Sequence, residues 1–474
     1  MTHATPHEPV LDTARIRDPY KLDPVDIQDP PRTFRGKLKF LGPGMITSAA
    51  VVGSGELLTA TTLGAQVGFI LLWLVLVSTF VKVWVQIELG RWTISTGRVA
   101  VSGYNDVPPR IAKRGWMAWL VLLMFVQFMT SQAGVISAAA FAFSSLLPIG
   151  PDPYSLLSIG TWVAILVAIA VVIHYFNRYT LVEGLSTFLV VAVTGFAILV
   201  VFLLQGTEWA WTLGDMAEGM RFQIAVGAFG VALSMFGLAG VGAGEVTAYT
   251  YWCVEKGYAA WTGPRDDSQA WVDRARGWIG VMKLDAWVSW VVYTLSTASF
   301  YILGAAVLHP QGLTPEGSEV MTTIASIFDS AVGRWGAVVF LIGAGTALFK
   351  TIIANVPSLG RQVGNTLAVF GAFDWEDRKV RDRWMRWIMI VLPILWGIFG
   401  TIVRSPLPLV ILAGILNSIF LIGVAISTLY LSRTQTDPRV KDGAAFNAMV
   451  GISAIAITLV GVIGLYNTIA DLLG

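Results

Sequence analysis

The sequence predicts an all-α membrane protein with about eleven transmembrane helices, two of which are broken. Three observations lead to this fold class. First, 55% of the 474 residues are hydrophobic and only 13% are charged, about half the charged fraction of a typical soluble domain. Second, apolar stretches of about 20 residues, long enough to cross a bilayer as a helix, recur along the chain. Third, one short motif, V-G-[SA]-G-E, stands inside two of these stretches.

The expected membrane domain follows a polar N-terminal segment. Residues 1–38 are rich in Asp and Pro and lack the apolar core of a signal peptide, so we expect a poorly ordered cytoplasmic tail. Residues 39–474 form the transmembrane domain. Its expected spans are 41–64, 67–91, 117–147, 160–177, 180–205, 222–256, 278–308, 332–352, 384–403, 406–431 and 445–472.

Basic residues predict the orientation of these spans. With the N-terminus in the cytoplasm, five inner segments receive clusters of Lys and Arg, whereas the outer segments receive only Arg221, Arg334 and Arg404. We therefore expect a multi-pass protein of the plasma (inner) membrane with an extracytoplasmic C-terminus. The loops are short and show no nucleophile–base pair, so we do not expect an enzyme.

Charge and cysteine content exclude several kinds of partner. A net charge of +2 gives no reason to expect nucleic-acid binding. The one cysteine, Cys253, and four scattered histidines cannot build a structural zinc site. We therefore expect a monomer whose partners are membrane lipid and a small ion or small-molecule substrate, with no resident cofactor beyond a transported divalent cation.

The repeated motif lies at Gly53–Glu56 in the first expected span and at Gly242–Glu245 in the sixth. Two glycines within three residues weaken a helix by roughly 1 kcal/mol each. Freed backbone groups in lipid are tolerated only where they face protein or a cavity. Matched breaks in two halves therefore indicate a transporter with its site at the breaks, and each Glu should start the second half-helix. The alternative is that the glycines only allow close helix packing, with each Glu in an ion pair.

From Leu41 onward the sequence resembles the NRAMP family of divalent metal transporters. Gly42-Pro43-Gly44 precedes the first motif at the family's spacing, and GAQVGFILLWLVLVS resembles the family's GAQFGYxLLWxLLLS. The resemblance implies a LeuT-type fold that works by alternating access. It would consist of a first repeat over about 39–206, an inverted second repeat over about 220–432, and an extra helix at 445–472.

The chain departs from the family at the metal-binding motifs. Gly53 and Glu56 stand where the family's D-P-G-N has Asp and Asn, and Gly242 stands where its M-P-H has Met. In the third helix Ser131 replaces an acidic residue linked to proton movement, so we expect proton coupling to be weak or rerouted. Asn417 matches a Gln of the tenth helix near the family's site.

Two buried lysines complicate the charge of the expected site. Lys82 lies deep in the second span and Lys350 toward the inner end of the eighth. Each either neutralises a glutamate or reaches the inner interface by snorkelling.

The predicted site residues follow from the motifs and the resemblance. The substrate-binding set is Gly53, Ser54, Gly55, Glu56, Gly242, Ala243, Gly244, Glu245 and Asn417. The predicted metal ligands are Glu56 and Glu245. Candidates for coupling or charge pairing are Glu56, Glu245, Lys82, Lys350 and Ser131.

These residues predict secondary active transport of a hard divalent cation of the Mg²⁺ or Mn²⁺ type. Two carboxylates supply hard oxygen ligands, and no thioether remains to select a soft metal. Because small residues would enlarge the space at the breaks, a small organic solute, either an amine or an amino acid, is an alternative cargo. A third hypothesis is a transporter-like sensor that does not transport. The sequence leaves these alternatives open.

Overall fold

The computed structural model describes residue 16 and residues 18–175, 179–225, 227–316, 319–403 and 405–473. Within these ranges ten helices are long and apolar enough to cross a membrane. The first expected span is not among them because it consists of three short pieces, α2 (Pro43–Val51), η3 (Ser54–Ala60) and α3 (Thr61–Val67). Together with this broken helix, the ten account for the eleven expected spans.

The remaining spans follow in chain order. In the first half they are α4 (Leu72–Thr96), α6 (Trp116–Leu146), α7 (Leu156–Tyr175) and α8 (Tyr179–Leu203). The sixth span is divided into α10 (Phe229–Leu238) and α11 (Ala243–Lys256). The later spans are α13 (Gln269–Leu303) with η5 (Gly304–Leu308), α15 (Arg334–Val369), α16 (Arg378–Val403), α17 (Pro406–Thr434) and α18 (Ala444–Leu473).

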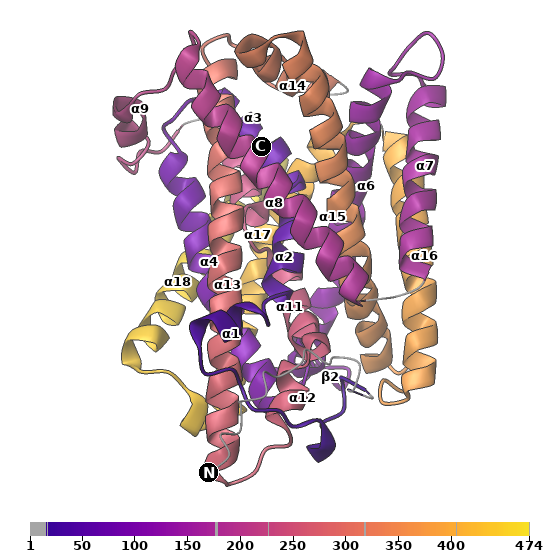
Figure 1. The fold of residues 1–474 in the computed structure, drawn as a ribbon, viewed down its shortest axis with the longest axis vertical. Coiled ribbons are helices and arrows are strands. Elements are labelled where there is room, and N and C mark those ends of the chain that lie inside the picture. The colour runs from indigo at the N-terminus through magenta and orange to yellow at the C-terminus, as the bar shows by residue number, and fades with distance from the viewer. Residues whose placement is uncertain are drawn as a thin grey trace, which may run out of the picture.

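Short elements precede or connect the spans. They are α1 (Phe34–Leu38), α5 (Ala100–Tyr104), the hairpin of β1 (Arg110–Ile111) and β2 (Arg114–Gly115), α9 (Leu213–Glu218), α12 (Tyr258–Thr262) and α14 (Val320–Val332). In Figure 1 the hairpin, α1 and α12 lie toward the lower end of the molecule, and α9 and α14 lie toward the upper end.

Several spans are longer than the sequence predicted, two of them by nine residues or more. α13 begins at Gln269 rather than at 278, and α15 continues to Val369 rather than ending at 352. A search for apolar stretches detects only the part of a helix that lies within the bilayer. It therefore misses polar turns by which the same helix continues outside the bilayer.

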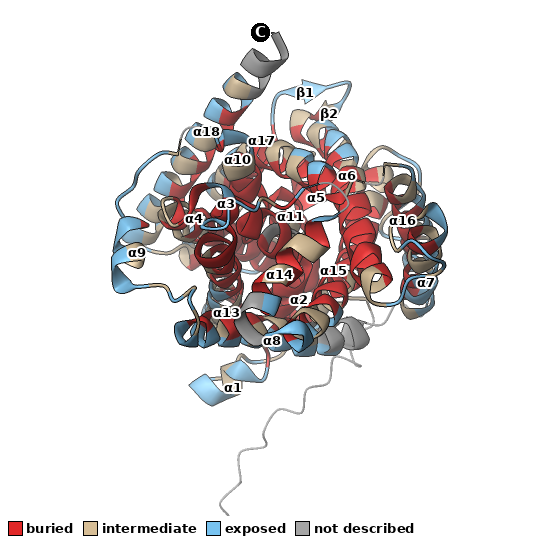
Figure 2. Ribbon diagram, turned by 90° about the horizontal axis from the view of Figure 1, so that it is seen from above, coloured by how far each residue is buried: buried red, intermediate tan, exposed pale blue. Residues whose placement is uncertain are grey.

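Burial separates a central group of helices from a peripheral one (Figure 2). In the α10–α11 span 72% of the most apolar window is buried, compared with 28% in α7. The exposed side of α7 carries large apolar side chains such as Leu157 and Val172, which suits contact with lipid. Polar groups in the central helices must find partners within the protein, so the functional site is expected there.

The N-terminal segment packs against the lower end of the bundle (Figure 1). Arg381 Nη2 donates a hydrogen bond to Asp18 at 2.7 Å, and the Tyr20 hydroxyl donates to Glu255 at 2.5 Å. The expectation of a poorly ordered tail is therefore wrong from Asp18 onward, while residues 1–15 and 17 lie outside the described residues. Local polarity did not reveal these contacts because their partners are distant in the sequence.

Candidate functional site

Both repeated motifs break their helices, slightly earlier than predicted. After α2 the backbone leaves the helix at Val52 and Gly53, and the second break covers Ala239–Gly242. The predicted breaks are therefore present, but the unwound backbone reaches only the first glycine of each motif and does not extend over Gly53–Glu56 or Gly242–Glu245. In each motif the first glycine ends the break, and a new helix starts directly after it.

Each motif glutamate folds back onto the start of its own half-helix. Glu56 Oε2 accepts a hydrogen bond from the Gly53 backbone N–H at 3.2 Å, and Glu245 Oε2 accepts one from Gly242 at 3.1 Å. Helix N-termini carry N–H groups without helical partners and a partial positive charge, so they favour a carboxylate there. The predicted position of both glutamates, directly after a break, is confirmed.

The two glutamates then differ in their surroundings. Glu56 is fully buried, and its Oε1 accepts from the Thr297 hydroxyl of α13 at 3.1 Å and from the Gly240 N–H of the second break at 3.5 Å. Glu56 thereby ties the two breaks together. Glu245 is only partly buried and lines a cavity. Since Glu56 is not part of that lining, its role as a metal ligand stays a prediction.

The buried lysines bind backbone carbonyls rather than glutamates. Lys82 and Lys350 are 0% and 1% exposed, so snorkelling to the interface is excluded. Their ammonium groups donate to carbonyl oxygens at the C-terminal ends of α10 and α2, respectively. Among the described side chains, no direct salt bridge joins either lysine to Glu56 or Glu245. Each break therefore has a carboxylate at the start of its second half-helix and an ammonium at the end of its first.

Asn417 of α17 holds the second break together. Its Oδ1 accepts from the Ala243 N–H at 2.9 Å, and its Nδ2 donates to the Gly237 carbonyl at 3.1 Å. Gly242 permits this approach, because a Cβ there would lie 2.0 Å from Asn417 Nδ2. Asn417, expected as a binding residue, supports the backbone and does not line the cavity.

Gly53 and Gly244 also admit side chains from neighbouring helices. A Cβ at Gly53 would lie 2.2 Å from Thr351 Oγ1, and a Cβ at Gly244 would lie 2.5 Å from the Phe128 ring. At these two positions neighbouring side chains fill the space that the small residues were expected to leave open. The two glycines let α15 and α6 approach the breaks closely.

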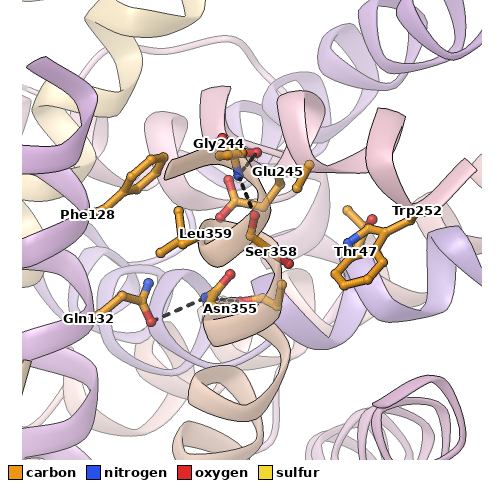
Figure 3. A pocket seen from close by; sticks show the side chains of 12 residues that line it. Thr47, Phe128, Gln132, Gly244, Glu245, Trp252, Asn355, Ser358 and Leu359 are labelled. Carbon is orange, nitrogen blue, oxygen red and sulfur yellow. Dashed lines mark hydrogen bonds between the residues drawn. The ribbon is translucent and has the colours of Figure 1, made fainter. Parts of the chain in front are cut away.

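A small cavity lies beside Glu245, between α2, α6, α11 and α15. Its polar lining consists of Thr47, Gln132, Glu245, Asn355, Ser358 and Gln362. In Figure 3 the Phe128 and Trp252 rings lie on opposite sides, and Asn355 Nδ2 donates to Gln132 Oε1 at 3.3 Å. The space accommodates about one water-sized sphere.

The side-chain atoms around this cavity that could coordinate a cation are oxygens. Glu245 contributes the one charged side chain of the lining, and Gln362 Oε1 has no hydrogen-bond partner. Within the described part of the chain, no three His, Cys, Asp or Glu side chains gather into a metal site. One carboxylate with neutral amide and hydroxyl oxygens suits a small hard cation that keeps part of its water shell. The amides of Gln132, Asn355 and Gln362 escaped sequence analysis because isolated amides in apolar helices follow no recognisable spacing.

The remaining predicted residues lie near the cavity without forming it. Ala243 begins α11, and Ser131 is buried on α6 next to Gln132. The side-chain surroundings of Ser54 and Gly55 lie outside the described part of the structure.

Comparisons with known proteins agree with this architecture. Residues 44–467 match the model of the Natural resistance-associated macrophage protein-like (Nramp) family. An uncharacterized protein of Pasteurella multocida is 22% identical over 352 residues, which cover 72% of this chain and 73% of the relative. The divalent metal cation transporter MntH of Yersinia enterocolitica is 32% identical over 114 residues, 24% of this chain and 27% of the relative.

The same fold occurs in a solved structure. A manganese transporter of Eremococcus coleocola superposes with a TM-score of 0.69 at 14% identity, covering 96% of this chain and 92% of that chain. This likeness confirms the predicted LeuT-type fold with broken first and sixth helices. Because the family model spans nearly the whole membrane domain, the chain belongs to the Nramp family.

Proposed function

We propose that this transporter moves a hard divalent cation of the Mg²⁺ or Mn²⁺ type by alternating access, with the cavity at Glu245 as its binding site. The observation that carries the proposal is one carboxylate among amide and hydroxyl oxygens, beside a helix break, in a space of ionic size. The names of two relatives, a divalent metal cation transporter and a manganese transporter, support the same class of cargo.

The lining favours a hard cation over a soft one. The Glu245 carboxylate would supply charge, and the amide oxygens of Gln132, Asn355 and Gln362 would supply neutral ligands. Mg²⁺ is typically held by one or two carboxylates and retains several waters. The lining contains no Met or Cys, so it offers no ligand that prefers a soft metal.

The size of the cavity weighs against an organic cargo. Sites for drug-sized molecules occupy roughly 300–1,000 Å³, whereas this one holds about one water-sized sphere. An amine or amino acid would require α6 or α15 to move outward. A small cation would fit the observed conformation.

We also propose that the lower end of the molecule in Figure 1 faces the cytoplasm and that the protein works as a monomer in the plasma (inner) membrane. The basic residues Arg274 and Arg276 near the start of α13, and Arg378 at the start of α16, support this orientation. Because eleven spans are an odd number, the C-terminus would then lie outside. The repeat boundaries at about 39–206 and 220–432, with 445–472 as an extra helix, remain part of this proposal.

Cation uptake into proteoliposomes tests the proposed function. Proteoliposomes that contain the purified protein should take up Mg²⁺ or Mn²⁺. Glu245→Gln should weaken the apparent affinity for the transported cation by at least about tenfold, equivalent to 1.4 kcal/mol. Glu376→Gln, which removes a carboxylate from the exposed loop before α16, is the matched control and should behave as wild type.

Three results would contradict the proposal. Uptake that is unaffected by Glu245→Gln would place the site elsewhere. Uptake of an amine or amino acid with no Mg²⁺ or Mn²⁺ uptake would support the organic-solute alternative. Binding of a ligand without any uptake would support the sensor hypothesis.

A further inference from the structure

We propose that Lys350 and Lys82 are resident cations of the two helix breaks. In broken-helix transporters, unwound carbonyls and half-helix C-termini coordinate the coupling cation. In this chain an ammonium group attached to a neighbouring helix occupies such a carbonyl site at each break. The transporter therefore needs no free Na⁺ or K⁺ there. This inference rests on different residues from the proposed cargo site and holds whichever solute binds beside Glu245.

The first carbonyl site lies where α2 ends. Lys350 Nζ donates to the Ala49 carbonyl at 2.9 Å and to the Val52 carbonyl. The Thr351 hydroxyl lies 3.3 and 3.2 Å from the same two oxygens, and Asn355 Nδ2 donates to the Ala50 carbonyl at 3.4 Å. The last carbonyls of a helix lack helical partners and carry partial negative charge. Side chains of α15 therefore satisfy this end with a cation at its centre.

The second carbonyl site lies where α10 ends, and it is built in the same way. Lys82 Nζ donates to the Phe236 carbonyl at 2.5 Å and to the Ala239 carbonyl. Asn417 Nδ2 donates to the Gly237 carbonyl between them at 3.1 Å. Here the cation comes from α4 and the amide from α17.

The two sites match position by position. In both Ala49–Val52 and Phe236–Ala239 a lysine binds the first and fourth carbonyls and an asparagine binds the second. The lysines come from the second and eighth spans. Different helices supply the same groups to the same carbonyl positions. We therefore infer that each broken helix end needs a positive charge.

The surrounding charges explain why a bound ammonium is stable there. An ammonium group has three N–H donors and loses much hydration free energy when it is buried without partners. At each break the carbonyls accept from it, while Glu56 and Glu245 bind the N–H groups across the break. The four charges sum to zero when all are ionised. Because each ammonium is part of the chain, it cannot leave with the cargo, as a free coupling ion would.

Thermal unfolding of the purified full-length protein, with ²²Na⁺ binding, tests the inference. We expect the wild-type melting temperature to be equal in NaCl and in choline chloride at constant ionic strength, with no saturable ²²Na⁺ binding. Lys350→Ala removes the ammonium and leaves its space. Its melting temperature should fall, and propylammonium, which replaces the deleted atoms, should restore most of the loss through binding to the folded state.

Three controls separate a cation site from a general loss of packing. Tetramethylammonium has no N–H donor and should not restore Lys350→Ala. Lys350→Met keeps most of the volume without the charge, so it should unfold at a lower temperature than wild type and should not respond to propylammonium. Lys283→Ala removes a part-exposed lysine that pairs with Asp442 and should show no propylammonium effect.

Several outcomes would overturn the inference. They are saturable ²²Na⁺ binding to the wild type, a wild-type melting temperature for Lys350→Met, or equal restoration of Lys350→Ala by propylammonium and tetramethylammonium. If the Lys350 variants do not fold, the wild-type ²²Na⁺ measurement and the same rescue of Lys82→Ala decide the question. Failure of cation uptake would contradict the proposed cargo while leaving these results unchanged.

Discussion

A methyl group added at Gly242 tests whether a glycine is needed there for Asn417 to pack against the second break. The Cβ of Gly242→Ala would lie 2.0 Å from Asn417 Nδ2 and 2.7 Å from Glu245 Oε2. Asn417 cannot rotate away freely, because hydrogen bonds hold it to Ala243 and Gly237. Gly242 has φ −87°, which any residue adopts, so the cost arises from the clash rather than from backbone strain.

The magnitude follows from the bonds that the clash would break. Displacing the Asn417 amide leaves the Ala243 N–H and the Gly237 carbonyl without these partners in a buried site. Each unsatisfied buried group costs about 1–3 kcal/mol. We therefore expect Gly242→Ala to lose about 2–6 kcal/mol of unfolding free energy, and cation uptake should fall because Glu245 is also displaced.

Unfolding in detergent titrations measures this loss, with Gly343→Ala as the matched control. Gly343 lies within α15, and a Cβ there would meet no heavy atom within 4 Å. Its substitution should be neutral or stabilise the helix by up to about 1 kcal/mol. If the free energies of unfolding of the two variants differ by less than about 0.5 kcal/mol, the reasoning about Asn417 is refuted.

Two further substitutions probe the lower part of the bundle. Arg361 of α15 binds both carboxylate oxygens of Glu255 on α11, at 2.6 and 2.7 Å. Losing one partner of a buried ion pair costs about 3–5 kcal/mol. Arg361→Met should therefore speed amide hydrogen exchange at the end of α11. Unchanged exchange would show that the pair does not stabilise this end of the helix. Asp285 accepts from two backbone N–H groups, one of them of Gly44, at the start of α2. Hydrogen bonds to a charged group contribute about 1.5–3 kcal/mol each, so Asp285→Asn should lower the melting temperature. The control Asp382→Asn, at a half-exposed carboxylate that pairs with Arg378, should not. Equal melting temperatures of the two variants would refute the capping role.

The sequence alone was sufficient for the membrane class, the spans and the two broken helices. Lipid imposes long apolar runs, and a glycine pair within such a run interrupts the helix at a local position. The glutamate three residues after the first glycine was placed correctly for the same reason. Its partner, the backbone N–H of that glycine, lies within one helical turn.

Only the tertiary structure decided which groups meet at the breaks. Lys82 binds α10 and Lys350 binds α2, although both pairs are far apart in the sequence and neither lysine pairs directly with a glutamate. It also separated Glu56, which joins the two breaks, from Glu245, which faces the cavity. In both copies of the motif the glutamate binds the backbone N–H of the first glycine, but the helices packed around each copy differ. The function of each charge therefore depends on contacts between distant helices, which local pattern and spacing do not encode.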